Sequence, residues 1–136
     1  MANSPVEPVL TAPLFPRLYA AHVEMLERLT PEQWDLPTVC EGWSVRDVAQ
    51  HMMRVDVGWL SGGRDGFHEK ATINGWDDLI AFINMRNDVW VRATRRMGAR
   101  LLTEVVPLLG GMLVEYIDTL DPFAPGPAIN WAGDEP

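Results

Sequence analysis

The chain has 136 residues, 47% of them hydrophobic, and a formal net charge of −8. This length is enough for one domain with its own core, and the acidic balance argues against binding to the phosphate backbone of a nucleic acid. No apolar run reaches the roughly 20 residues that a membrane-spanning helix needs, so we expect a cytoplasmic protein with one domain over residues 1–136, no membrane association and no nucleic-acid partner.

The first predicted helix covers residues 11–29. Thr11 is placed to cap its N-terminus, and Thr30-Pro31 ends it. One face of this helix combines residues at spacings of three and four: Leu14, Leu18, His22, Met25 and Leu29. The preceding residues 1–10 are polar and rich in proline, and we expect an extended tail there.

The second predicted helix runs to Leu60 after Ser44. Ser44 is a suitable N-cap, and Asp47 three positions later completes the pattern of a capping box. The apolar side of this helix consists of Val45, Val48, Met52, Val55 and Trp59. His51 lies on that same side. Taken without its neighbours in the sequence, a histidine on an apolar face is more often a hydrogen-bonded core residue than a metal ligand.

A loop with four glycines over residues 61–75 precedes a third predicted helix over residues 76–97. Asn87 lies inside the apolar stripe of this helix, together with Leu79, Ile83, Trp90, Val91 and Thr94. A buried amide should be hydrogen-bonded, so Asn87 either lines a pocket or ties two helices together. The arginines of this helix and its end could bind an anionic substrate carboxylate, although a solvated helix face is the more usual explanation. They are Arg86, Arg92, Arg95 and Arg96.

The fourth predicted helix covers residues 99–120. Pro107 and the pair Gly110-Gly111 interrupt its apolar pattern, which predicts a kink or a division into two shorter helices. Residues 122–136 hold four prolines and two glycines, and we expect a second extended tail.

The segment that leads into the second helix combines rare residues at fixed spacing. It reads Trp34-Asp35-Leu36-Pro37-Thr38-Val39-Cys40-Glu41-Gly42-Trp43-Ser44-Val45-Arg46-Asp47-Val48-Ala49-Gln50-His51. This order resembles a signature of the DinB-like family of mycothiol-dependent maleylpyruvate isomerases. In that family the signature lies in the N-terminal domain, which binds the metal. Trp34 and Trp43 bracket the Pro37-Thr38 turn, and with Gly42 they should anchor this loop and fix the start of the helix.

The resemblance implies an all-α, DinB-like up-and-down helical bundle with a divalent metal, zinc or nickel, at one end. In that family one ligand is a histidine of the second helix, and an acid and a histidine spaced by four come from the last bundle helix. The metal activates a low-molecular-weight thiol such as mycothiol, for isomerisation of maleylpyruvate or thiol transfer to a small electrophilic substrate. His51 matches the first ligand.

The other two ligands have no match in the sequence. Asp47 and His51 are the one acid–histidine pair spaced by four, and both belong to the second helix. We therefore expect a metal site that is incomplete in this chain and a bundle that lacks its last helix. A truncated protein, a divergent member and a site completed by a partner chain are the open alternatives.

Three other polar residues are candidates for this site. Asp47 could orient the His51 imidazole, although stabilisation of the helix start is the simpler role. His22 of the first helix could meet His51 across the bundle, and Asn87 could line the pocket. No catalytic residue is assigned. Cys40 is expected to be a packed, inert thiol, because the family's reactive thiol comes from the cosubstrate.

Two functions follow from this pattern. The first is a thiol- and metal-dependent isomerase or S-transferase. The alternative is a non-catalytic DinB-like binding or dimerisation module with no functional metal site. A bundle that lacks a helix leaves an apolar groove, and such surfaces promote association. We therefore predict a homodimer, with exchange of the Pro122–Pro136 tail as one way to form it.

Overall fold

The computed structural model describes residues 9–68 and 70–125 of the chain. Its helices, in chain order, are the 3₁₀ turn Ala12–Leu14 (η1), α1 Phe15–Glu27, the 3₁₀ turn Gln33–Asp35 (η2), α2 Val45–Gly58, the π-helical segment Trp59–Arg64 (η3), α3 Trp76–Thr94 and α4 Ala99–Asp118. The described ranges contain no β-strand, and none of their helices is long and apolar enough to cross a membrane. The predicted all-α class is confirmed.

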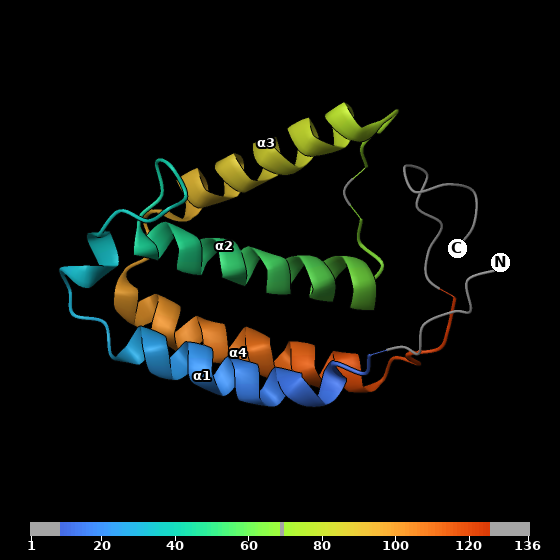
Figure 1. The fold of residues 1–136 in the computed structure, drawn as a ribbon, viewed down its shortest axis with the longest axis horizontal. Helices are drawn as coiled ribbons and strands as arrows, with labels where there is room; N and C mark the ends of the chain where they lie inside the picture. Colours follow the sequence, from blue (N-terminus) through green and yellow to red (C-terminus); the bar gives the residue numbers. More distant parts are fainter. Residues whose placement is uncertain (1–8, 69, 126–136) are drawn as a thin grey trace, which may run out of the picture.

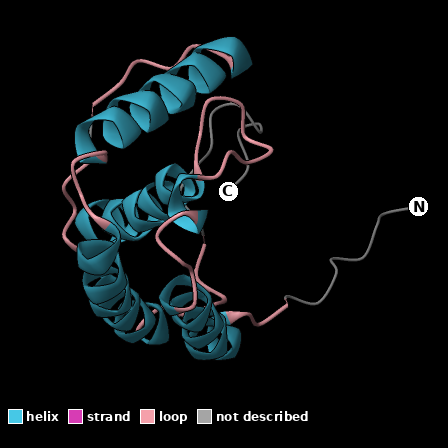
Figure 2. Cartoon of the chain, turned by 90° about the vertical axis from the view of Figure 1, so that its left-hand side faces the viewer, coloured by secondary structure: helices cyan, strands magenta, loops and turns pink. Residues whose placement is uncertain are grey.

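The four long helices form an open arc (Figures 1 and 2). α1 packs on α4, α4 packs on α2, and α2 packs on α3. Within the described residues, α1 and α3, at the two ends of this row, share no extensive contact. Successive helices run in opposite directions (Figure 1), as the predicted up-and-down bundle requires. The arc leaves one side of α2 without a helix packed on it.

The core forms where α1, α2 and α4 meet. Its buried members are Leu26, Trp34, Ala49, Met53, Leu102 and Val106. The stripes predicted for the first two helices are rotated away from it. Leu14, Leu18 and Met25 are more than half exposed. Met52 of α2 and Trp59, the first residue of η3, are also exposed. Both helices carry an apolar band wider than the surface that α4 covers, and periodicity does not say which edge of a wide band is buried.

α3 packs on α2 by its C-terminal half and diverges from it toward its N-terminus (Figure 1). Val91 is its one fully buried residue among the described positions. Ile80 lies three helical turns before Val91 and so on nearly the same side, yet Ile80 is exposed, as is Ile83. One apolar stripe is thus covered at one end of α3 and uncovered at the other.

α4 continues through Pro107 without a break, so the predicted division into two helices is wrong. Proline cannot donate a hydrogen bond to the carbonyl of Thr103, and it costs about 3 kcal/mol inside a helix. The turns around it bury Leu102, Val106 and Leu113, and this apolar burial offsets the cost.

The described part of the chain covers little of the two predicted tails. Residues 9–10 and 122–125 belong to the described ranges and form no long helix. The remainder of the predicted tails, 1–8 and 126–136, lies outside the described residues. The loop predicted over residues 61–75 begins later than expected, because the helical segment η3 continues from α2 to Arg64.

Gly110 tests the packing of α1 on α4. A Cβ at this buried position would lie 2.7 Å from Cε1 and 2.9 Å from Cγ of Tyr19, whereas at Gly111 it would meet no atom within 4 Å. We expect Gly110→Ala to destabilise the fold by about 1–3 kcal/mol through this overlap. Gly111→Ala is the matched control and should stabilise the helix by up to about 1 kcal/mol. Urea unfolding measures both, and equal effects of the two variants would contradict the packing.

Candidate functional site around His51

The loop over residues 36–45 is closed by hydrogen bonds that begin α2. The N–H of Thr38 donates to the Trp43 carbonyl over 3.0 Å, and the N–H of Val45 donates to the Leu36 carbonyl over 3.0 Å. The Thr38 hydroxyl donates to the same Trp43 carbonyl over 2.9 Å. Gly42 has a φ of 78°, a conformation that side chains other than glycine rarely adopt. The motif residues Thr38 and Gly42 therefore shape this turn.

The two tryptophans of the motif have different roles. Trp34 is 3% exposed and belongs to the core, so it anchors η2 as expected. Trp43 is only half-buried, and its ring centroid lies 5.1 Å from that of the His51 imidazole at an interplanar angle of 49°. Arg46 of α2 pairs with Asp35 of η2 over 2.8 Å and holds the two elements together. The loop thus positions the face of His51 directly.

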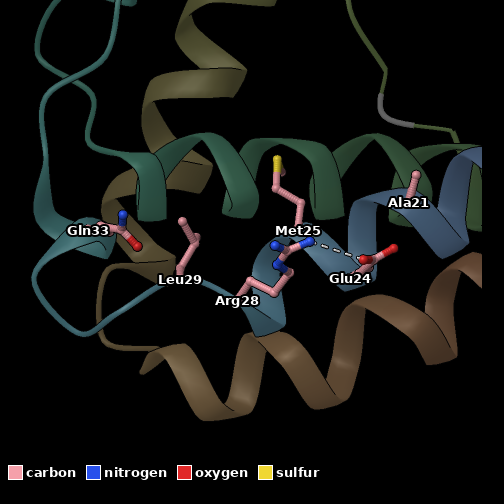
Figure 3. Close-up of a pocket in the computed structure, with 6 residues that line it drawn as sticks. All are labelled: Ala21, Glu24, Met25, Arg28, Leu29 and Gln33. Carbon is pink, nitrogen blue, oxygen red and sulfur yellow. Dashed lines mark hydrogen bonds and ion pairs between the residues drawn. The ribbon is translucent and has the colours of Figure 1, made fainter.

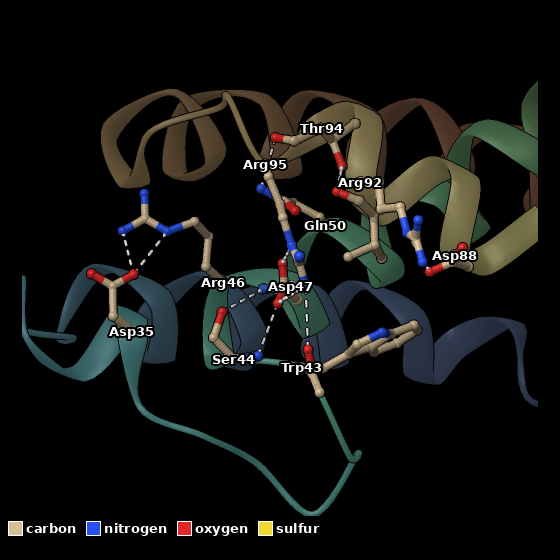
Figure 4. Close-up of polar contacts among 12 residues, drawn as sticks. Asp35, Trp43, Ser44, Arg46, Asp47, Gln50, Asp88, Arg92, Thr94 and Arg95 are labelled. Carbon is tan, nitrogen blue, oxygen red and sulfur yellow. Dashed lines mark hydrogen bonds and ion pairs between the residues drawn. The ribbon is translucent and has the colours of Figure 1, made fainter.

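The start of α2 is fixed by Asp47, which is 4% exposed (Figure 4). The N–H of Ser44 donates to its Oδ2 over 3.0 Å, and the N–H of Asp47 donates to the Ser44 hydroxyl over 3.3 Å, which is the predicted capping box. Arg95 after α3 donates from Nε to Oδ1 over 3.0 Å and from Nη2 to Oδ2 over 3.1 Å. No hydrogen bond joins Asp47 to His51 among the described residues.

Burial by itself would raise the pKa of Asp47. The hydrogen bond from Arg95, the Ser44 N–H and the charge of Arg95 outweigh it and lower that pKa below its ordinary value. Asp47 is therefore ionised at neutral pH, and its charge is shared between the helix start and the Arg95 guanidinium.

A second set of bonds joins α2 to α3 one turn further on. The fully buried Gln50 donates from its amide nitrogen to the Thr94 carbonyl over 2.8 Å. Trp90 donates from its indole nitrogen to the Gln50 carbonyl, also over 2.8 Å. With the Asp47–Arg95 pair, these bonds form the α2–α3 latch, which we define as Asp47, Gln50, Trp90, Thr94 and Arg95. The sequence did not single out Gln50, and it placed Arg95 on a solvated face, because the partners of both residues are distant in the chain.

His51 lies on α2 one turn after Asp47 and is partly buried. Its Nδ1 is buried and has no hydrogen-bond partner among the described residues. Burial, and secondly the charge of Arg54, lower the pKa of His51 below its ordinary value. The imidazole is therefore mostly neutral at neutral pH, the form that binds a metal or accepts a proton.

The described residues do not fit a complete metal site. Among them, no group of three His, Cys, Asp or Glu side chains is placed to hold an ion. One imidazole does not supply the three protein ligands that a zinc site normally needs. Within the described part of the chain, His51 therefore belongs to no group of three potential ligands.

His22 takes part in a different cluster, between α1 and α2. The Tyr19 hydroxyl donates a hydrogen bond to the buried carboxylate Oδ1 of Asp56. Burial raises the pKa of Asp56, although the Tyr19 hydrogen bond and the His22 charge oppose the rise. Burial lowers the pKa of His22, and the charge of Asp56 partly opposes that change. The sequence missed this cluster, although an acid at position 56 amid apolar neighbours was a visible signal.

The remaining candidates also lie near the latch. Asn87 is on α3, and its Oδ1 is buried without a hydrogen-bond partner among the described residues, contrary to the expectation that the amide would be bonded. The Oε1 of Gln50 is likewise buried without a hydrogen-bond partner among the described residues. Cys40 is exposed in the motif loop, so the expected packed thiol is not found.

Two surface hollows flank this region. One lies on α1 and η2 (Figure 3), lined by Ala21, Glu24, Met25, Arg28, Leu29 and Gln33. The other is polar and lies beside the latch, lined by Glu41, Gly42, Trp43, Asp88, Arg92 and Arg95. Neither includes His51 among its lining residues. Figure 3 shows Met25 directed from α1 toward α2, which places this side chain on the open side of the arc.

Arg95 tests the latch. Arg95→Ala leaves the Asp47 carboxylate buried without its ion pair, and we expect it to destabilise the fold by about 1–3 kcal/mol. Arg92→Ala is the matched control: Arg92 pairs with Asp88 at an exposed i,i+4 site, and its loss should cost less than about 0.5 kcal/mol. Equal losses in chemical unfolding would contradict the latch. At acid pH the wild-type advantage should shrink, because a carboxylate with a lowered pKa loses its stabilisation as pH falls through that pKa.

Asp56 should show the opposite pH dependence. Its pKa is raised by burial from the ordinary 3.8, so its stabilising contribution is complete below that value and is lost as pH rises through the raised pKa. Asp56→Asn removes this titration and keeps an oxygen that can accept from Tyr19. We expect the variant to gain stability relative to wild type between pH 4 and pH 7 in urea unfolding. A stability difference that does not change over this range would refute a buried, titrating Asp56.

Comparison with known protein families gives a match over most of the chain. Residues 15–106 match the family described as mycothiol maleylpyruvate isomerase N-terminal domain, which covers α1, α2, α3, the motif loop and the first part of α4. No curated protein and no solved structure matches the chain. The match spans more than half of the 136 residues, so the chain belongs to the family of the mycothiol maleylpyruvate isomerase N-terminal domain.

Proposed function

We propose that this chain is the His51-bearing helical part of an isomerase or S-transferase that uses a low-molecular-weight thiol of the mycothiol type. Its substrate would be a small electrophile such as maleylpyruvate. Family membership supports the thiol and the reaction class. His51 supports a site beside the middle of α2, because the motif loop and the latch hold the N-terminal half of this helix in place.

One observation carries the proposal. Thr38, Ser44 and Asp47 of the motif use their polar atoms to build the loop and the helix start. His51, in contrast, keeps a buried Nδ1 without a partner among the described residues. Gln50 also has an unpaired buried oxygen, but its amide nitrogen is bonded to Thr94, whereas no side-chain hydrogen bond ties His51 to another described residue. A buried polar atom without a hydrogen bond costs about 1–3 kcal/mol, so a purely structural position would favour an apolar residue. We infer that His51 serves a ligand rather than the fold.

The proposed ligand is a divalent metal, zinc or nickel, with His51 as one of several ligands. Since the described residues do not complete the site, the other ligands would come from outside them or from another chain. We derive no reaction step through the metal for this reason.

The alternative is a non-catalytic binding or dimerisation module of the same fold. The lack of three converging ligands among the described residues favours it, as do the exposed apolar stripes of α1, α2 and α3.

Metal analysis separates the two functions. The protein should be purified from medium that contains zinc and nickel, and its metal content measured by mass spectrometry beside His51→Ala and His22→Ala. The proposal expects His51→Ala to lose most of the bound metal and His22→Ala to retain it, because His22 belongs to the Asp56 cluster. Conversion of maleylpyruvate in the presence of mycothiol should follow the same order. Metal far below one equivalent in all three proteins would rule out the enzyme and leave the binding module.

A further inference from the structure

α1, α2, α3 and the turns beside them present apolar side chains that the described residues cover only in part. We call this surface the open face. It consists of Leu14, Leu18, Met25, Met52, Trp59, Ile80 and Ile83, each between 40% and 61% exposed. None of these residues is ionisable. They lie on or beside α1, on α2 and the start of η3, and on the half of α3 that diverges from α2 (Figure 1).

The spacing of the open face is that of a helix-packing surface. Leu18 and Met25 are seven residues apart, as are Met52 and Trp59, while Ile80 and Ile83 occupy one side of α3. Residues seven apart return to nearly the same side of a helix and form the stripe that packs against another helix. The open face is thus suited to one or more helices rather than to a small molecule.

We propose that the open face is the interface with a second copy of this chain. The chain itself offers a matching element, because the N-terminal half of α3 projects from the body with its apolar side uncovered (Figure 1). In a two-fold pair, α3 of each copy would pack on the α1 and α2 stripes of the other. Such an isologous interface uses the same surface twice, which is the commonest form of homodimer.

The size of the surface agrees with this assignment. Large side chains present about 150–250 Å² each when fully exposed, so the open face offers on the order of 700 Å². A stable protein–protein interface buries about 800 Å² per partner. The net charge of −8 on each copy opposes association, but charges at the rim of an apolar interface are screened beyond about 8 Å at physiological salt.

A rival surface exists on the outer side of α4. It consists of Leu101, Leu108 and Met112, which are exposed. Leu108 is two positions after the buried Val106 and therefore points away from the core. This patch belongs to a single helix and has fewer than half as many large apolar residues, so we assign the interface to the open face.

Sedimentation velocity over protein concentrations from about 1 to 100 μM tests the assignment. The wild-type protein should sediment as a dimer of the 15.3 kDa chain at the upper end. Leu18→Glu on α1 and Ile83→Glu on α3 should each raise the dissociation constant by on the order of tenfold or more, because each buries a charge at the interface. Leu108→Glu is the matched control on α4 and should leave the dissociation constant unchanged.

Each outcome decides the proposal. Circular dichroism shows whether the variants keep their helices. If one of the two open-face variants unfolds, the dissociation constant of the other still tests the interface. A wild-type monomer at every concentration overturns the proposal. A dimer that Leu108→Glu dissociates, or that a folded open-face variant leaves intact, also overturns it. The oligomeric state is read without metal or thiol, so this result is independent of the proposed catalytic function.

Discussion

The carboxylate of Asp47 is the point on which the arrangement around His51 depends. It bonds the backbone that begins α2 and the guanidinium of Arg95 that follows α3. Arg95 in turn donates to the Gly42 carbonyl over 3.2 Å, so the turn of the motif loop is held by the same residue. Charge-assisted bonds in a buried position are about twice as strong as neutral ones. One ion pair therefore joins a loop and two helices that are far apart in the sequence.

This constraint acts at one end of α3 only. The latch holds Trp90, Thr94 and Arg95 against α2, while Ile80 and Ile83 have no comparable contact. The divergence of α3 and the open face are thus consequences of where the polar bonds lie. A helix fixed at its C-terminal end can accept a packing partner along its N-terminal half without breaking the latch. Positioning of His51 and the proposed association with a second chain would therefore be separable.

The sequence predicted the helices and the capping box well because these depend on local chemistry. Ser44 and Asp47 are three residues apart, and their bonds need no tertiary structure. The buried sides of α1 and α2 were predicted poorly. Leu18 and Met52 fit the helical period as well as Leu26 and Met53 do, and only the position of α4 decides between them. The predicted division of the fourth helix at Pro107 was wrong for a similar reason. Burial of the neighbouring apolar side chains outweighs the free-energy cost of a proline inside the helix.

The candidate site shows the same limit. Motif resemblance located His51, but it assigned no role to Gln50, Arg95 or Asp56, whose partners lie 37 to 48 residues away. The motif combines residues that build the fold with one residue, His51, that we propose to bind a ligand. Thr38, Gly42 and Ser44 build the turn and the helix start, and their presence alone argues for the fold rather than for catalysis.

His51 is the motif residue that separates fold from function. Its ring packs on Trp43, which an apolar side chain could do equally well. What an apolar side chain could not supply is a neutral imidazole with a buried nitrogen that the fold leaves without a partner. Replacement of both the nitrogen and its environment by apolar groups would be nearly neutral for stability, whereas an unpaired nitrogen is costly. The bonds among the described residues therefore give no reason for a histidine at this position, and the proposed ligand role of His51 rests on this observation.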